Sequence, residues 1–199
     1  MEPKRQLRQA LWQLRLALRR GTPRRPILRV EGEWLQLNRE AGVWADVWQL
    51  EEAFSEIRGV QGAGVNEAQV QRLRRGVDLY RADLLEGWYS DWCHYERERL
   101  KTVYLAALDK LLAYCEAHGL FEEGLLYGER ILAHDRAHER THRRMMHLHQ
   151  LAGDRTRALR QFDRCAVALR EELAMEPSHS MLALREQIRG DRLAALEPH

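Results

Sequence analysis

The sequence has few cysteines and no long hydrophobic run. Cys93, Cys115 and Cys165 are the only cysteines among 199 residues, and they are far apart. An odd number of isolated cysteines favours neither a disulfide framework nor a cysteine-ligated metal site. No apolar run approaches the roughly 18 residues that cross a bilayer, and the first 20 residues are too charged for a signal peptide. We therefore expect a cytoplasmic protein without a membrane partner.

The sequence also lacks the motifs of common enzymes. It has no glycine-rich phosphate loop, no GxSxG elbow and no paired catalytic carboxylates. One match to HExxH occurs, in which His138 and His142 would bind zinc and Glu139 would activate a water. The metzincin extension is absent, because Met145 and Leu148 stand at its glycine and third-histidine positions. We expect neither an enzyme nor a metal site nor a cofactor.

Apolar residues make up 45% and charged residues 31% of the chain, which is typical of a globular protein with a well-solvated surface. The net charge is only +2, but it is unevenly distributed. Residues 4–29 contain no acid, and this segment suits a polyanion. Its basic residues are Lys4, Arg5, Arg8, Arg15, Arg19, Arg20, Arg24, Arg25 and Arg29.

The first 45 residues predict a helix, a hairpin and a further strand. Leucines recur at helical spacing over residues 7–18, on a different face from the basic side chains. Strand-like runs at 27–30 and 34–37 flank a turn at Gly32. The stretch "GVWADV" predicts one more short strand before Asp46 caps the next helix.

From about residue 46 onward the sequence predicts only helices. Asn66 and Gln69 have the spacing of a capping box. The expected helices cover residues 47–58, 67–84, a long segment ending near 117, and then 121–134, 137–152, 155–174 and 179–189.

A degenerate internal repeat runs through the second half. Gly119 and Gly153 are 34 residues apart, which is the tetratricopeptide period. In this register the second copy has the small and aromatic pair Ala158 and Phe162. The first copy has Gly124 and Gly128 at the same positions.

Several elements together make the chain resemble a known family. They are "LLEGWYSDW", "ERERL" at 96–100, Glu139, Met146, "GDR" at 153–155, "AL" at 158–159 and "ELAMEPS" at 172–178. Over about residues 44–190 the sequence resembles the bacterial transcriptional activator domain of regulators similar to the Streptomyces antibiotic regulatory proteins. The resemblance implies a mainly α fold: a tetratricopeptide-like array over 46–192, with an N-terminal helix and small β-hairpin over 1–45 as a partial winged helix.

In that family the array follows a winged helix-turn-helix that binds promoter DNA. "LRQALWQLRLALRRG" looks like its recognition helix and "ILRVEGEWLQLN" like its wing. The sheet and two helices that precede a recognition helix do not occur in this sequence, so the chain is a fragment, has a truncated start or has a decayed domain. We expect weak, salt-sensitive DNA binding by this chain alone. The nominated DNA-binding residues are Arg5, Arg8, Gln9, Arg15, Arg19 and Arg29; without the resemblance they indicate only a solvated basic face.

The resemblance also implies that the array mediates self-association, as a homodimer, or contact with RNA polymerase or another protein partner. The arginines nominated for this contact are Arg140, Arg143, Arg144, Arg155 and Arg157; ordinary surface charge is the alternative interpretation. The alternative function is an adaptor that binds proteins or small ligands without binding DNA.

Two further groups of side chains are expected to pack inside the array. Trp88, Tyr89 and Trp92 resemble a packing anchor at a helix start more than a ligand-stacking platform. Met145 and Met146 are expected to fill space between helices.

Overall fold

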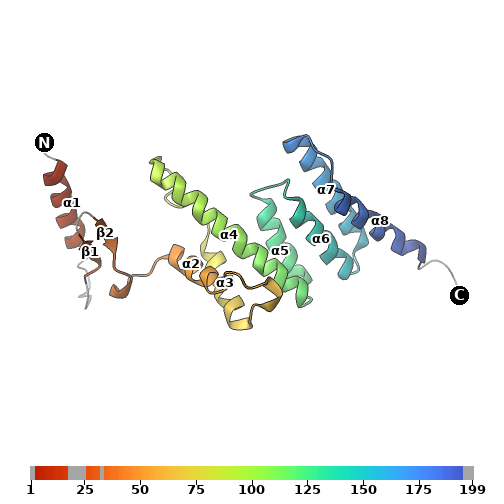
Figure 1. Ribbon diagram of the computed structural model, residues 1–199, viewed down its shortest axis with the longest axis horizontal. Helices are drawn as coiled ribbons and strands as arrows, with labels where there is room; N and C mark the ends of the chain where they lie inside the picture. The colour runs from red at the N-terminus through yellow and green to blue at the C-terminus, as the bar shows by residue number, and fades with distance from the viewer. Residues whose placement is uncertain (1–2, 18–25, 32–33, 195–199) are drawn as a thin grey trace. The chain divides into compact units, whose positions relative to one another are not determined.

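The computed structural model describes residues 3–17, 26–31 and 34–194. These residues form eight α-helices and one β-hairpin, so the predicted mainly α fold is confirmed (Figure 1). The elements are α1 (Pro3–Ala17), β1 (Leu28–Glu31), β2 (Trp34–Leu37), α2 (Asp46–Ser55), α3 (Glu67–Leu79), α4 (Asp91–Ala117), α5 (Phe121–Leu132), α6 (Glu139–Leu151), α7 (Arg155–Leu173) and α8 (His179–Ala194). The chain divides into two compact units, Met1–Trp48 and Gln49–His199, which are described separately.

The hairpin of the first unit is closed by Asn38. Strands β1 and β2 pair antiparallel, with Leu28 opposite Leu37. Next to this pair, the buried Asn38 donates through Nδ2 to the Pro26 carbonyl oxygen at 2.9 Å and through its backbone N–H to Ile27 at 2.7 Å. Asn38 thereby satisfies two backbone carbonyl oxygens at the open end of a two-stranded sheet.

The prediction of a third strand from "GVWADV" was wrong. A short 3₁₀ turn, Arg39–Ala41, is followed by Gly42 in the left-handed conformation at φ +75°, which turns the chain. Residues 43–45 then run without a strand partner among the described residues. The Asp46 carboxylate accepts from the Val47 N–H at 2.8 Å at the start of α2.

Local capping explains where α3 begins. The Asn66 side chain accepts from the Gln69 N–H at 3.0 Å, and the Gln69 side chain accepts from the Asn66 N–H at 3.1 Å, so the predicted capping box is present. The helix ends at Leu79, earlier than expected, and the ring of the next residue, Tyr80, stacks on Tyr104 of α4 with 4.2 Å between the ring centroids.

Helices α4 to α8 follow one another as packed neighbours, in the manner of a tetratricopeptide array (Figure 1). The 34-residue period is visible in the turns, because Gly119 and Gly153 both have positive φ, +69° and +76°. It is also visible in burial: Gly124 and Ala158 occupy equivalent positions and are both buried.

The first copy replaces the aromatic of the repeat with a side chain from another helix. A Cβ placed on Gly128 would lie 2.6 Å from the Sδ of Met145 on α6. The methionine therefore occupies the space that Phe162 fills in its own copy. Both predicted methionines are buried, which confirms their packing role.

The prediction that an aromatic cluster packs as an anchor before α4 was wrong. Trp88, Tyr89 and Trp92 are 59%, 83% and 54% exposed. Up to Arg99, only Cys93 of α4 is buried, and in Figure 1 this end of α4 projects beyond α5. Against the described residues, these three aromatic side chains therefore do not act as a packing anchor. No helix in the described part of the chain is long and apolar enough to span a membrane.

Candidate functional site

The nominated basic face of α1 is exposed to solvent. Arg5, Arg8, Gln9 and Arg15 are all exposed, and no described side chain of this helix is buried. Arg19 lies outside the described residues. The helix has no acidic residue in its first turn, and its last turn contains Arg15. Arginine can donate to phosphate from such a face, and glutamine can read the edge of a base.

Arg29 on β1 is in a different situation from the arginines of α1. Its guanidinium lies 3.1 Å from a carboxylate oxygen of Glu40, and both side chains are about half exposed. A pair this exposed contributes about 0–1 kcal/mol, so a phosphate can replace Glu40 at little cost.

The five arginines nominated on the array all have partners within it. Arg144 is the most enclosed: its Nη1 lies 2.9 Å from Asp109 and its Nε 3.0 Å from Glu116, both on α4. Arg140 also reaches Asp109, at 3.3 Å. These two residues tie α6 to α4.

The remaining three arginines hold other junctions. Arg143 donates to the Ser180 hydroxyl at 3.4 Å, and Arg155 donates to the Arg189 carbonyl oxygen at 2.6 Å, so both connect to α8. Arg157 pairs with Asp154 at 3.2 Å within its own helix start. Arg143 and Arg144 also line a cavity of about 310 Å³ beside Leu184. Binding of a further partner by these residues stays a prediction.

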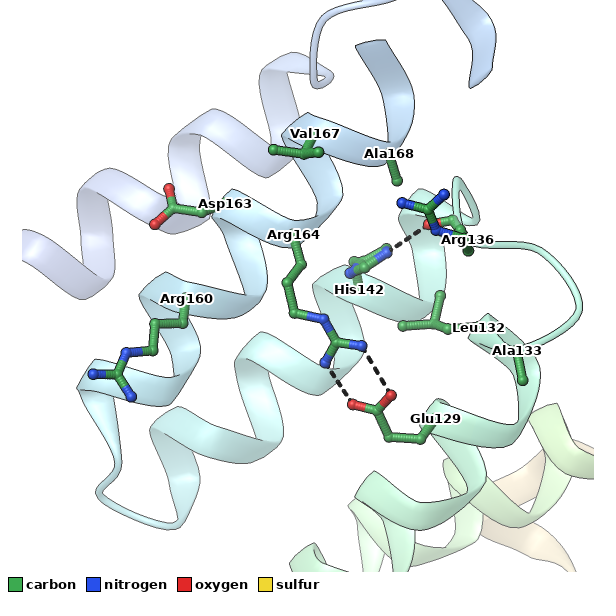
Figure 2. Close-up of a pocket in the computed structure, with 10 residues that line it drawn as sticks. All are labelled: Glu129, Leu132, Ala133, Arg136, His142, Arg160, Asp163, Arg164, Val167 and Ala168. Atoms are coloured by element: carbon green, nitrogen blue, oxygen red, sulfur yellow. Dashed lines mark hydrogen bonds and ion pairs between the residues drawn. The ribbon is translucent and has the colours of Figure 1, made fainter. Parts of the chain in front are cut away.

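A larger groove lies between α5, α6 and α7 (Figure 2). Its volume is about 750 Å³, and apolar side chains form its floor. An ion pair crosses it: the Arg164 guanidinium binds both carboxylate oxygens of Glu129, at 2.6 and 3.0 Å. The hydrogen bond from Arg164 lowers the pKa of Glu129. The lining residues are Glu129, Leu132, Ala133, Arg136, His142, Arg160, Asp163, Arg164, Val167 and Ala168.

A hydrogen-bond chain beneath this groove fixes the protonation of His142. Arg164 donates to the Gln161 Oε1 at 3.1 Å, so the Gln161 amide must donate to His142 Nδ1, at 2.8 Å. The His142 Nε2–H then donates to the Arg136 carbonyl oxygen at 2.9 Å. Burial lowers the pKa of His142, which favours this neutral form.

Every side chain of the HExxH match is therefore engaged in packing or hydrogen bonding. Both ring nitrogens of His142 are used, and His138 Nδ1 lies 2.8 Å from the Thr141 hydroxyl. The Glu139 carboxylate accepts from the hydroxyl and the N–H of Ser178, just before α8. Among the described residues, no group of three or more His, Cys, Asp or Glu side chains could hold a metal ion.

A comparison with known protein families identifies the family of this helical array. Residues 45–189 match the family model of the bacterial transcriptional activator domain. The chain belongs to this family. A search of curated proteins found no match.

The activator domain has one arginine whose role the sequence analysis missed. Arg97, within the signature "ERERL", donates to the carbonyl oxygens of Leu84 at 2.6 Å and Trp88 at 2.8 Å, and also to that of Leu85. No local pattern predicts a contact that spans nine to thirteen residues through a loop.

The unit before the activator domain contains a second missed residue. Trp12 is 64% exposed. It lies four residues after Arg8 and three before Arg15, so it shares their face of α1. Helical spacing could have revealed it, because the nominated set considered only polar and charged residues.

Proposed function

We propose that this member of the activator domain family is a DNA-binding transcription regulator. The description of its family, the bacterial transcriptional activator domain, supports a role in transcription regulation. Residues 1–45 are proposed to be the C-terminal part of a winged helix and residues 46–192 the activator array. Promoter DNA is the proposed partner of the first segment.

The exposed basic face of α1 is the observation that supports DNA binding. Arg5, Arg8 and Arg15 lie on an exposed helix within an acid-free segment, and an antiparallel hairpin suited to be a wing follows in the chain. In such a unit the helix enters the major groove and flanking arginines contact phosphates. We assign base contact to Gln9, and phosphate contact to Arg5, Arg8, Arg15, Arg19 and Arg29.

A salt titration with double-stranded DNA tests this proposal. We expect the duplex upstream of the encoding gene to bind with an affinity that falls steeply with salt, measured by fluorescence anisotropy. The variant Arg8→Ala/Arg15→Ala should reduce the slope of log K against log salt by about 2, since two phosphate contacts are lost.

The matched control removes the same charge elsewhere. Arg75 and Arg160 are exposed arginines of the array that are not nominated for any contact. Arg75→Ala/Arg160→Ala should leave the slope unchanged. Equal losses in both double variants, or no binding at low salt, would contradict the assignment and favour the adaptor function.

We further propose that the array binds a protein partner, either RNA polymerase or a second copy of the chain. Arg140 and Arg157 support this role best, because they are 64% and 69% exposed and their ion pairs are solvated. Arg140→Glu/Arg157→Glu should weaken cosedimentation with purified RNA polymerase, or shift the mass of a homodimer toward the monomer. Retention of both properties would remove these residues from the interface.

A further inference from the structure

Four exposed aromatic side chains gather where α4 begins. Trp88, Tyr89, Trp92 and Tyr95, here called the aromatic patch, are 59%, 83%, 54% and 81% exposed. Trp92 and Tyr95 are three residues apart on α4 and share one helix face, and the other two directly precede the helix. Exposed tryptophan and tyrosine in one place are typical of a protein-binding surface.

The backbone that carries this patch is held in place. Arg97 donates to the carbonyl oxygens of Leu84, Leu85 and Trp88. Leu85 and Gly87 both have positive φ, +50° and +87°, which makes the loop compact. Cys93 points inward and is fully buried. A partner would therefore meet aromatics on an ordered backbone and lose little entropy on binding them.

The surroundings of the patch are acidic. Residues 81–98 contain five carboxylates and two guanidiniums, so the segment has a net charge of −3. Glu86, Asp91 and Glu98 are exposed among the aromatics. This charge repels nucleic acid, and it opposes the pairing of the patch with its copy on a second chain.

We propose that the aromatic patch docks a cationic amphipathic helix of a protein partner. Lysine or arginine side chains of that helix lie over the Trp88 and Trp92 rings, because the negative face of an aromatic ring attracts a cation. Glu86 and Asp91 steer the approach, and the apolar face of the helix covers the rest of the patch. The inference rests on the proposed function only in taking the array to have a protein partner.

Direct binding of a defined peptide tests the proposal without DNA. The probe is a synthetic helical peptide with leucine at three- and four-residue spacing and arginine elsewhere; a second peptide has glutamate for each arginine. We expect isothermal titration calorimetry on the full chain to detect the cationic peptide only. Trp88→Ala/Trp92→Ala should weaken binding at least tenfold, and Glu86→Gln/Asp91→Asn should weaken it less and flatten its salt dependence.

Matched variants separate the patch from general effects. Trp34→Ala/Trp44→Ala removes two tryptophans of the first unit that are at least as exposed as Trp88 and Trp92, and this variant should bind the peptide as the parent chain does. Arg97→Ala keeps all four aromatics but frees the loop, so it should weaken binding while the unfolding transition of the array persists.

Three results would overturn the proposal. They are equal affinity for the two peptides, equal binding by Trp88→Ala/Trp92→Ala and the parent chain, and self-association of the parent chain that the same double substitution abolishes. The DNA titration of Arg8→Ala/Arg15→Ala tests DNA binding alone, and the peptide titration tests the aromatic patch alone. A negative result for the aromatic patch can therefore be distinguished from a negative result for the proposed function.

Discussion

Replacing Gly128 with alanine should change the stability of the array in a direction that depends on Met145. The new Cβ would lie 2.6 Å from the Met145 Sδ and 2.7 Å from its Cγ. Overpacking of this kind costs about 1–3 kcal/mol, whereas alanine in place of glycine inside a helix gains about 1 kcal/mol. We expect Gly128→Ala to lower the free energy of unfolding by about 1 kcal/mol.

The same substitution should stabilise a chain that lacks the methionine. Met145→Ala alone should lower the free energy of unfolding by about 2–5 kcal/mol, because it opens a cavity under α5. With the thioether gone, the Gly128→Ala methyl enters free space, and only its gain of about 1 kcal/mol in helix propensity remains. The effect of Gly128→Ala thus reverses sign between the two backgrounds, which gives a coupling energy of about 2 kcal/mol.

Urea unfolding followed by circular dichroism measures all four chains of this cycle. Gly190→Ala on α8 is the matched control, because a Cβ at Gly190 would have no neighbouring atom within 4 Å. This substitution should raise the free energy of unfolding by up to about 1 kcal/mol in either background. If Gly128→Ala has the same effect with and without Met145, the reasoning that methionine replaces the aromatic of the repeat is refuted.

Three further predictions concern the charged and histidine-containing parts of the array. Arg144→Met should lower the free energy of unfolding by about 1–3 kcal/mol, since Asp109 and Glu116 lose a largely buried partner. Arg140→Met should lower it by only about 0–1 kcal/mol. Equal losses of stability in the two variants would contradict this prediction. Burial lowers the pKa of His142 in the folded chain. The contribution of this histidine to stability is therefore complete at pH values above its pKa in the unfolded chain, and it is lost as the pH falls below that pKa. Urea unfolding over that range should show a smaller loss in His142→Asn, and an unchanged loss would argue against the buried neutral ring. Incubation with EDTA should leave the melting temperature unchanged, whereas stoichiometric zinc found by mass spectrometry in protein without a histidine tag would reopen the HExxH interpretation.

Features set by neighbouring residues were predictable from the sequence. The capping box of Asn66 and Gln69, the antiparallel pairing of β1 with β2 and the long helix ending near residue 117 all follow from spacing within a few residues, whereas the predicted turn at Gly32 lies outside the described residues. The 34-residue period was also visible, because Gly119 and Gly153 each supply the left-handed turn that a helix end requires.

The candidate sites were only partly predictable. Helical periodicity placed Arg5, Arg8 and Arg15 on one exposed face, but a search for charge alone passed over Trp12. The enclosure of Arg144 could not be predicted from the sequence, for a different reason. A charged residue on an amphipathic helix looks solvated, and only the packing of α6 on α4 encloses it between Asp109 and Glu116.

The sequence by itself determined most of the local elements, their order and the family, because caps, periodicity and motif spacing depend on residues close in the chain. Tertiary structure alone decided which surfaces are covered. It left the aromatic patch exposed at the start of α4. It also placed Met145 against Gly128 and engaged both nitrogens of His142. These outcomes depend on which helices become neighbours, and short-range sequence patterns carry no information on that.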